Sequence, residues 1–305
     1  MHPPSPYASR GCAASRSRRG GLLRWTGVGK RGGQLQYSDV AIETALTLRL
    51  LFHLPLRQTE GFLRSIFGML CLDLSAPDHT TLSRRAQGLN LTLRRVPAAP
   101  GIHLLVDSTG LSKVGEGEWA AVKHGSRGTR GWQKLHLGVD GSGLIVAHAL
   151  TGGHVDDATT ALELIDMVEG EVSRLTADAA YDTRGIYEAA GARGATVVIP
   201  PTWRTTRRPT STRSRTASTH DRARRSAMSP PLIHWRLLLH RPLEPTSGYH
   251  QQARVENAFF RYKSIIGESL RARSRAAQET EAILACNILN QMTQFGGPAS
   301  YAIGR

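Results

Sequence analysis

The sequence HLLVDST at residues 103–109 is typical of a buried strand that ends in a carboxylate, and the rest of the predicted fold is arranged around it. Three large apolar residues stand directly before Asp107, and small or polar residues follow it. A short apolar run bounded in this way is typical of a strand inside a sheet. An aspartate at the end of such a strand either caps it as a turn residue or takes part in chemistry, since an unpaired carboxylate is rarely buried. The run itself leaves both interpretations open.

Downstream of this strand, the chain reads as a hairpin followed by alternating strands and helices. An Asp-Gly-Ser-Gly turn at 140–143 separates two apolar runs and predicts the hairpin, with Asp140 as a turn residue. Antiparallel strands followed by strand–helix alternation indicate a mixed α/β sheet. Asp156 and Asp157 are predicted to cap the first helix. The predicted strands cover 118–122, 133–139, 144–150, 172–176 and 195–200, and the predicted helices cover 157–168 and 183–190.

A second carboxylate stands where a later strand ends. Asp178 follows the run 172–176, whereas Asp182 precedes Thr183 and suits a helix N-cap. We therefore assign metal binding to Asp178 and capping to Asp182. Hydrolysis or transfer of a phosphodiester needs an activated nucleophile and a stabilised leaving oxygen, and two hard cations about 4 Å apart provide both. Since Mg²⁺ prefers carboxylate oxygens, Asp107 and Asp178 are candidate metal ligands.

The segment from Tyr249 to Ile266 predicts a helix with a polar stripe beside an apolar band. At roughly 100° per residue, the polar stripe combines a phenol, an amide, a carboxylate and an ammonium: Tyr249, Gln252, Glu256 and Lys263. The apolar band consists of Val255, Phe259, Tyr262 and Ile266. The stripe suits a metal and phosphate site, but a salt-bridged surface stripe has the same pattern. A last helix is predicted over 278–292.

Upstream of residue 91, the pattern predicts three short helices, over 38–53, 56–70 and 79–88. Ser38 or Asp39 can cap the first helix. The apolar residues predicted to pack are Ile42, Ala45, Leu46 and Leu50 on the first helix and Phe62, Ile66, Phe67 and Leu70 on the second. A sharp turn before the third helix gives the outline of a helix-turn-helix module. The third helix, capped by Asp78, carries side chains that can reach phosphates and base edges. These are Thr80, Thr81, Ser83, Arg84, Arg85 and Gln87. A solvated polar face on a helical bundle is the alternative.

The net charge of +15 is concentrated in two segments. Residues 1–33 carry seven basic residues and no acid, and residues 201–248 carry ten arginines, no lysine and two acids. These segments account for the whole excess, so a basic arm and an unusual insert are predicted to meet a polyanion such as DNA. The basic run 123–130, which includes Lys123 and His124, either contacts a DNA backbone or forms a solvated loop.

Several classes of protein are excluded. Cys12, Cys71 and Cys286 are far apart and form no zinc-finger spacing. No apolar run approaches the ~18 residues of a membrane span, and the basic N-terminus lacks the apolar core of a signal peptide. We expect a cytoplasmic, nucleoid-associated protein without a membrane partner.

Taken in order, these motifs resemble the DDE transposases of prokaryotic insertion sequences, in the group named after insertion sequence five and related to insertion sequence four. The resemblance covers roughly 35–200 and 249–292. It rests on VDSTG (106–110), GEW (117–119), KHG (123–125), WQKLHLGVD (132–140), TADAAYDT (176–183) and the segment 249–263.

The resemblance implies an RNase H-like mixed sheet with flanking helices over 101–295, preceded by a small helical DNA-binding domain over 35–95 and an arm over 1–34. It implies that Asp107, Asp178 and Glu256 bind Mg²⁺ or Mn²⁺ and act in catalysis. The residues expected to hold DNA or phosphate are Tyr249, Lys263, Lys123, His124, Arg84 and Arg85. The implied activity is cleavage and transfer of DNA strands at terminal inverted repeats into target DNA, by a homodimer.

Two features depart from the family. The arginine of the last motif is replaced by Gln252, whose amide offers phosphate no charge, and Arg254 lies on another side of the helix. The Arg/Ser/Thr/Pro-rich segment 201–248 differs from the helical, lysine-containing segment that the family has before its last motif. It is either an inserted loop or the product of a shift in the reading frame of the gene. The alternatives to an active transposase are therefore an inactive remnant, a helix-turn-helix DNA-binding protein, or a nuclease that cuts without joining.

Overall fold

The computed structural model describes residues 36–94, 101–114, 132–200 and 249–296. The chain divides into two compact units, Met1–Leu91 with Ala272–Ala285 and Thr92–Arg271 with Cys286–Arg305. The predicted strand 118–122, the basic run with Lys123 and His124, and the segment 201–248 lie outside the described residues.

The first unit contains the three predicted helices. They are α1 (Asp39–Leu51), α2 (Leu56–Met69) and α3 (His79–Arg85). The Ser38 side chain accepts the Ala41 N–H at the start of α1, and the Asp78 carboxylate accepts the N–H groups of Thr80 and Thr81 at the start of α3. These bonds satisfy backbone donors that a helix start leaves open. They confirm the predicted Asp78 cap and show that Ser38, of the two candidates Ser38 and Asp39, caps the first helix.

The core of this unit differs from the predicted one along α2. The stripe of α1 is buried as expected, with Ile42, Ala45, Leu46 and Leu50 all at most 3 % exposed. On α2 the fully buried side chains are Thr59 and Leu63, whereas Leu70 is 63 % exposed. Thr59 is tolerated inside because its hydroxyl donates to the Pro55 carbonyl at 3.1 Å.

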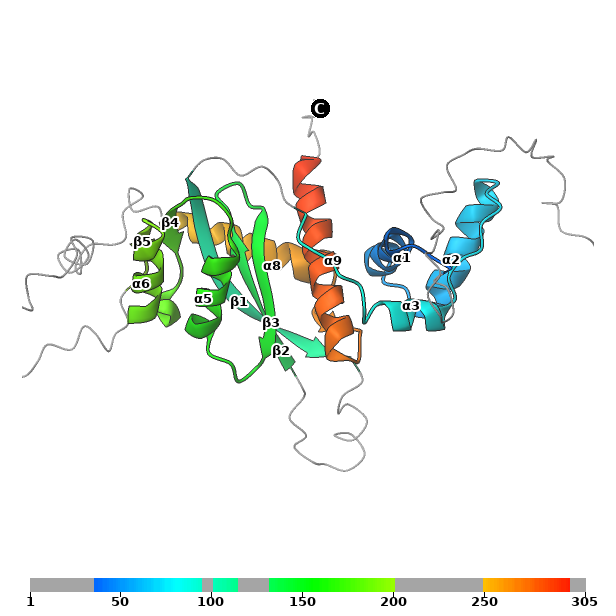
Figure 1. Ribbon diagram of the computed structural model, residues 1–305, viewed down its shortest axis with the longest axis horizontal. Helices are drawn as coiled ribbons and strands as arrows, with labels where there is room; N and C mark the ends of the chain where they lie inside the picture. The colour runs from blue at the N-terminus through cyan, green and yellow to red at the C-terminus, as the bar shows by residue number, and fades with distance from the viewer. Residues whose placement is uncertain (1–35, 95–100, 115–131, 201–248, 297–305) are drawn as a thin grey trace, which may run out of the picture. The chain divides into compact units, whose positions relative to one another are not determined.

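The second unit is built on a six-stranded mixed sheet with the strand order β3-β2-β1-β4-β5 (Figure 1). β1 pairs antiparallel with β2, and β2 with β3, whereas β1, β4 and β5 are parallel. The short β6 pairs with the far end of β1. The strands are β1 (Ile102–Lys113), β2 (Trp132–Val139), β3 (Ile145–Gly152), β4 (Val172–Thr176), β5 (Thr196–Val198) and β6 (Ser269–Leu270).

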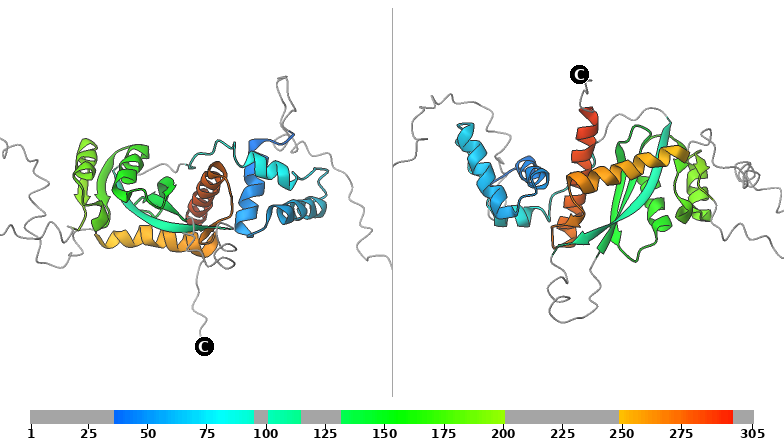
Figure 2. Two further views of the ribbon diagram at one scale, coloured as in Figure 1. Left: turned by 90° about the horizontal axis from the view of Figure 1, so that it is seen from below. Right: turned by 180° about the vertical axis from the view of Figure 1, so that it is seen from behind.

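Helices cover both faces of this sheet, as the predicted mixed α/β fold requires (Figures 1 and 2). On one face, α5 (Asp157–Met167) and α6 (Arg184–Ala192) bury the alternate β1 residues Ile102, Leu104 and Val106. On the other face, α8 (Ala253–Ile265) packs against β1 and β2.

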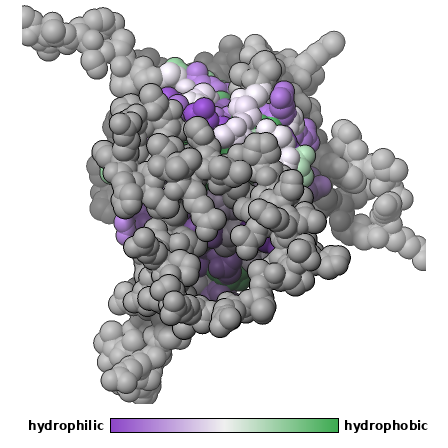
Figure 3. All heavy atoms as spheres, turned by 90° about the vertical axis from the view of Figure 1, so that its left-hand side faces the viewer, coloured by the Kyte–Doolittle hydropathy of each residue, from purple (hydrophilic) through white to green (hydrophobic). Residues whose placement is uncertain are grey.

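The last helix, α9 (Arg275–Gln294), joins the second unit through hydrogen bonds from its C-terminal part. The buried Asn290 side chain pairs with both backbone groups of Ile145 at 2.8 Å, and Arg261 of α8 donates to Thr293 and Leu289. Seen from the end that carries α6 and β5, the coloured surface is mostly hydrophilic (Figure 3).

Candidate active site

Asp107 and Asp178 stand at the same level on two neighbouring parallel strands. Asp107 lies in the middle of β1, which continues to Lys113 and so corrects the predicted strand end, and Asp178 lies two residues past the end of β4. The register pairs Leu105 of β1 with Thr176 of β4, so each aspartate lies two residues beyond this pair. Side chains two residues apart along a strand share a face. The fold therefore brings together the two carboxylates that the sequence assigns to metal binding, although they are separated by seventy residues of chain.

The segment that carries Glu256 is anchored to the same strand. Tyr249–Gln252 forms a 3₁₀ turn before α8 begins at Ala253, which corrects the single helix predicted from Tyr249. Tyr249 and Gln252 still share a face, because three residues complete one 3₁₀ turn. The Gln252 amide donates to the carbonyl of Val106 at 3.2 Å, directly beside Asp107. Glu256 follows one helical turn later and is exposed.

The electrostatics show that these carboxylates act on one another. The pKa of Asp107 is raised to about 6, mainly by burial and also by the charges of Asp178, Glu256 and Asp157, against a lowering hydrogen bond from the Ser108 N–H. The pKa of Tyr249 is also raised, by burial and by Asp178, Glu256 and Asp107. Tyr249 therefore lies within the field of all three predicted carboxylates.

Within the described ranges, no three acidic, histidine or cysteine side chains are close enough to hold a single metal ion. Two of the carboxylates are instead turned toward backbone donors: Asp107 accepts the Ser108 N–H at 2.7 Å and Asp178 the Ala180 N–H at 2.9 Å. The donor set nevertheless suits a hard divalent cation, since it consists of carboxylate oxygens. Burial first, and the charges of the neighbouring carboxylates in addition, raise the pKa of Asp107.

Two predicted caps are wrong, and one of them involves the site. Asp157 does not cap α5, because Asp156 does so by accepting the Thr159 N–H. The Asp157 carboxylate instead binds the Lys134 ammonium at 2.9 Å, and its charge reaches Asp107. No local pattern in the sequence predicts this ion pair, because Lys134 and Asp157 come together only through the packing of α5 on β2.

Asp182 does not cap α6 either. The turn Ala179–Tyr181 places Thr183 at the N-cap position, and the Asp182 carboxylate accepts the Tyr187 hydroxyl at 3.0 Å. The capping bond in this region comes from Asp178, which accepts the Ala180 N–H. The predicted turn role of Asp140 is confirmed, since its carboxylate accepts the N–H groups of Ser142 and Leu144.

A buried histidine beside the Lys134–Asp157 pair leads to a pH prediction. Burial lowers the pKa of His136 to about 4, although Asp157 acts in the opposite direction. Because the unfolded chain has a histidine pKa near ~6.5, it takes up this proton first as the pH falls. The stability that His136 contributes is therefore present above pH ~6.5 and is lost toward pH 4, at a cost of up to about 3 kcal/mol.

The free energy of urea unfolding, measured from pH 7 to pH 4, should accordingly fall less steeply in His136→Gln than in the parent. His154→Gln changes an exposed histidine and serves as the control. Equal slopes for His136→Gln and the parent would contradict this assignment. The comparison between variants is needed because the raised pKa of Asp107 contributes with the opposite sign over the lower part of this range.

The remaining predicted site residues are distributed as follows. Lys263 is half-buried on α8, two turns beyond Glu256. Arg84 is exposed on α3, whereas Arg85 donates to the Tyr37 carbonyl at 2.9 Å and pairs with Asp39, which ties α3 to the start of α1. Arg254 donates to the Gly141 carbonyl, away from the carboxylates.

A mixed sheet that brings together one acidic residue within its central strand and another just past the adjacent parallel strand, with a further acid on a covering helix, is consistent with an RNase H-like fold. Residues 98–291 match the family described as Transposase DDE domain, and residues 21–116 match a second family of the same description. The first match spans more than half of the 305 residues. The chain therefore belongs to the DDE transposase family.

None of the described helices combines the length and the apolar composition that crossing a bilayer requires.

Proposed function

We propose that this transposase cleaves DNA at the ends of its own insertion sequence and joins the released ends to target DNA, with Asp107, Asp178 and Glu256 as metal ligands. The observation that carries the proposal is the parallel register of β1 and β4, which sets Asp107 beside Asp178. Their repulsion, together with that of Glu256, is what a bound Mg²⁺ or Mn²⁺ would offset.

When bound, the divalent cations would lower the pKa of the attacking water and stabilise the leaving oxygen. In the first step, water attacks the scissile phosphorus and the bond to the 3′ oxygen breaks, which leaves a 3′-OH and a 5′-phosphate. In the second step, this 3′-OH attacks a target phosphodiester and displaces its 3′ oxygen. Tyr249 and Lys263 are placed by this proposal on the phosphates beside the reacting one.

DNA recognition is assigned to the helical unit. The exposed side of α3 carries Arg84 with Ser83 and Gln87, which can reach phosphates and base edges. A homodimer would hold the two inverted repeats together, and residues 123–130 would add backbone contacts.

The test is a strand-cleavage assay with the full chain and a duplex that carries the terminal repeat of the element. We expect a nick with a 3′-OH in the presence of Mn²⁺, a joined product when target DNA is added, and neither product in EDTA. Mn²⁺ should also raise the melting temperature of the parent but not of Asp107→Asn. Binding of the repeat without any cleavage would overturn the catalytic proposal.

A second candidate function is DNA-end binding without catalysis. The observation that favours it is Gln252, which stands where the family has an arginine and leaves the carboxylates without a guanidinium. Its side chain is 5 % exposed, and its Oε1 atom has no hydrogen-bond partner among the described residues. Parent protein and Asp107→Asn would then bind the repeat equally, and the parent would not cut in Mn²⁺.

A further inference from the structure

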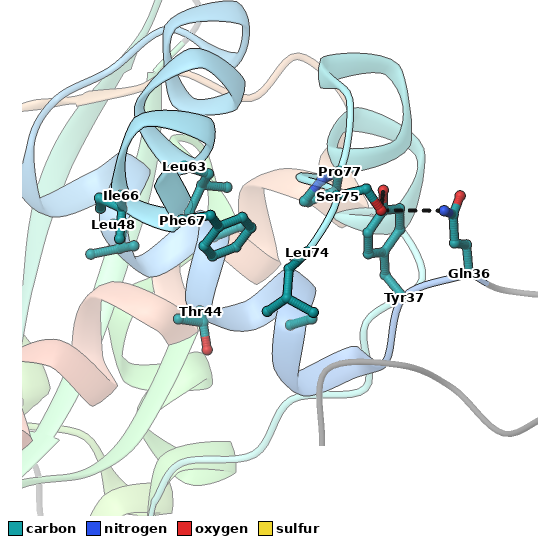
Figure 4. A pocket seen from close by; sticks show the side chains of 12 residues that line it. Gln36, Tyr37, Thr44, Leu48, Leu63, Ile66, Phe67, Leu74, Ser75 and Pro77 are labelled. Carbon is teal, nitrogen blue, oxygen red and sulfur yellow. Dashed lines mark hydrogen bonds between the residues drawn. The ribbon is translucent and has the colours of Figure 1, made fainter. Parts of the chain in front are cut away.

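The helical unit has an apolar groove that its own described helices leave open (Figure 4). The groove has a volume of about 190 Å³ and lies between α1, α2 and the connection to α3. Its wall is formed chiefly by Leu48, Leu63, Ile66, Phe67, Leu74 and Pro77. Ile66 and Phe67 belong to the α2 stripe that was predicted to be core, but they are only half-buried. The groove is therefore the part of this core that lacks a cover.

The described chain begins at the rim of this groove. Gln36 and Tyr37 line it, and both are fastened to its opposite side. The Tyr37 hydroxyl lies 3.3 Å from the Ser75 hydroxyl and 3.1 Å from the Ala76 carbonyl, and the Gln36 amide donates to Ser75 at 3.4 Å. Residues that precede Gln36 therefore leave directly from the edge of the groove.

We propose that Leu22, Leu23 and Trp25 fill this groove. They form the densest group of large apolar residues in the first 34 residues of the chain, which otherwise are mainly basic, small or polar. Ten residues separate Trp25 from Gln36, and four of them are glycines. Such a connection spans up to roughly 33 Å when extended and can turn back on itself, so it reaches any part of a groove within a small helical unit.

The family match also supports residues 22–25 as the occupant of the groove. The match that includes the helical unit starts at residue 21, immediately before Leu22, and leaves out residues 1–20. The segment 21–35 therefore belongs with the helices in the family pattern, whereas Arg10, Arg16, Arg18 and Arg19 lie outside it.

Docking of Leu22–Trp25 would give the basic arm a fixed point of departure. The last of the four arginines, Arg19, lies three residues before Leu22. Docking would therefore attach the arginine-containing arm to the unit that carries α3. One helical unit would then contact DNA at two places, with α3 and with an arm bound to the phosphate backbone. This inference concerns the helical unit and stands whether or not the carboxylate site cleaves DNA.

Photo-cross-linking in the full chain tests the docking. Thr44 is exposed at the groove and is replaced by p-benzoylphenylalanine, and Arg57, exposed on α2 away from the groove, is the control position. Mass spectrometry of a mixture of light and heavy chains should show Thr44-position cross-links to residues 22–25 of the same chain. Cross-links between chains, to other segments, or none at all would each overturn the proposal.

A pair of matched variants adds a second readout. Trp25→Asp places a charge in the proposed occupant, and Val28→Asp places the same charge three residues away. We expect Trp25→Asp to reduce the cross-link yield at least tenfold and to lower the midpoint of urea unfolding, with Val28→Asp close to the parent in both. Equal cross-link yields for Trp25→Asp and Val28→Asp would show that these apolar residues are not the occupant.

Discussion

Replacing Asp178 by Asn is expected to lower the rate of strand cleavage at element ends about a thousandfold. The change keeps the shape of the side chain and can still accept the Ala180 N–H, but it removes one of the negative charges that would hold the cation beside Asp107. Loss of a metal ligand removes several kcal/mol of transition-state stabilisation, and each 1.4 kcal/mol corresponds to about a factor of ten. Cleavage is measured under single-turnover conditions in Mn²⁺.

The control for this prediction is Asp166→Asn, which makes the same chemical change at an exposed position of α5. Both variants should bind the terminal repeat with the affinity of the parent, because α3 and the basic arm are unchanged. If Asp178→Asn retained more than a tenth of the parental rate, Asp178 would not be a metal ligand.

Replacing Gln252 by Arg is expected to raise the cleavage rate at least tenfold. The buried amide already donates to the Val106 carbonyl, and a guanidinium can make the same bond while it directs further N–H groups toward carboxylate or phosphate. A hydrogen bond to a charged group contributes about 1.5–3 kcal/mol, which corresponds to between ten- and a hundredfold in rate. The positive charge should also lower the pKa of Asp107 from its present value near 6.

The matched control is Gln251→Arg, which adds the same charge one residue earlier, at a half-buried position. A general gain in DNA affinity would appear in both variants, whereas a gain in the chemical step should appear only in Gln252→Arg. Melting temperatures measured alongside identify a variant whose larger side chain disturbs packing. A well-folded Gln252→Arg with the cleavage rate of Gln251→Arg would contradict the prediction.

The sequence was sufficient to predict the order of the elements, because each has a local signal. The run before Asp107, the turn at 140–143 and the capping residues Ser38 and Asp78 depend on neighbours within a few positions. The structure has the turn and both caps where they were predicted, and it has the strand, although β1 continues past its predicted end to Lys113. The apolar band of α8 is likewise confirmed, since Val255, Phe259, Tyr262 and Ile266 are all buried. The spacing of apolar residues along a helix predicts its buried face correctly when the tertiary packing buries that same face.

What the sequence could not supply depends on contacts between distant residues. The Lys134–Asp157 ion pair requires that α5 pack on β2, and the bond from Arg85 to Tyr37 requires that α3 return to the start of α1. Leu70 is exposed for the same reason: contacts with α1 and α3 determine which face of α2 is buried, and the sequence of α2 alone does not show these contacts. Asp107 and Asp178 were identified in advance because each directly follows a short apolar run, although β1 continues beyond Asp107.

The attachment of α8 to β1 at both of its ends has a consequence for how this chain tolerates change. Gln252 is bonded to β1 just before α8 begins, and β6, which follows α8, pairs with the far end of β1. One strand therefore carries the first carboxylate and also fixes the helix of the third. The connection from Pro200 to Tyr249 can then vary in length and composition without moving Glu256. Insertions are therefore expected to be tolerated there, and a shorter linker can replace this connection in an engineered chain.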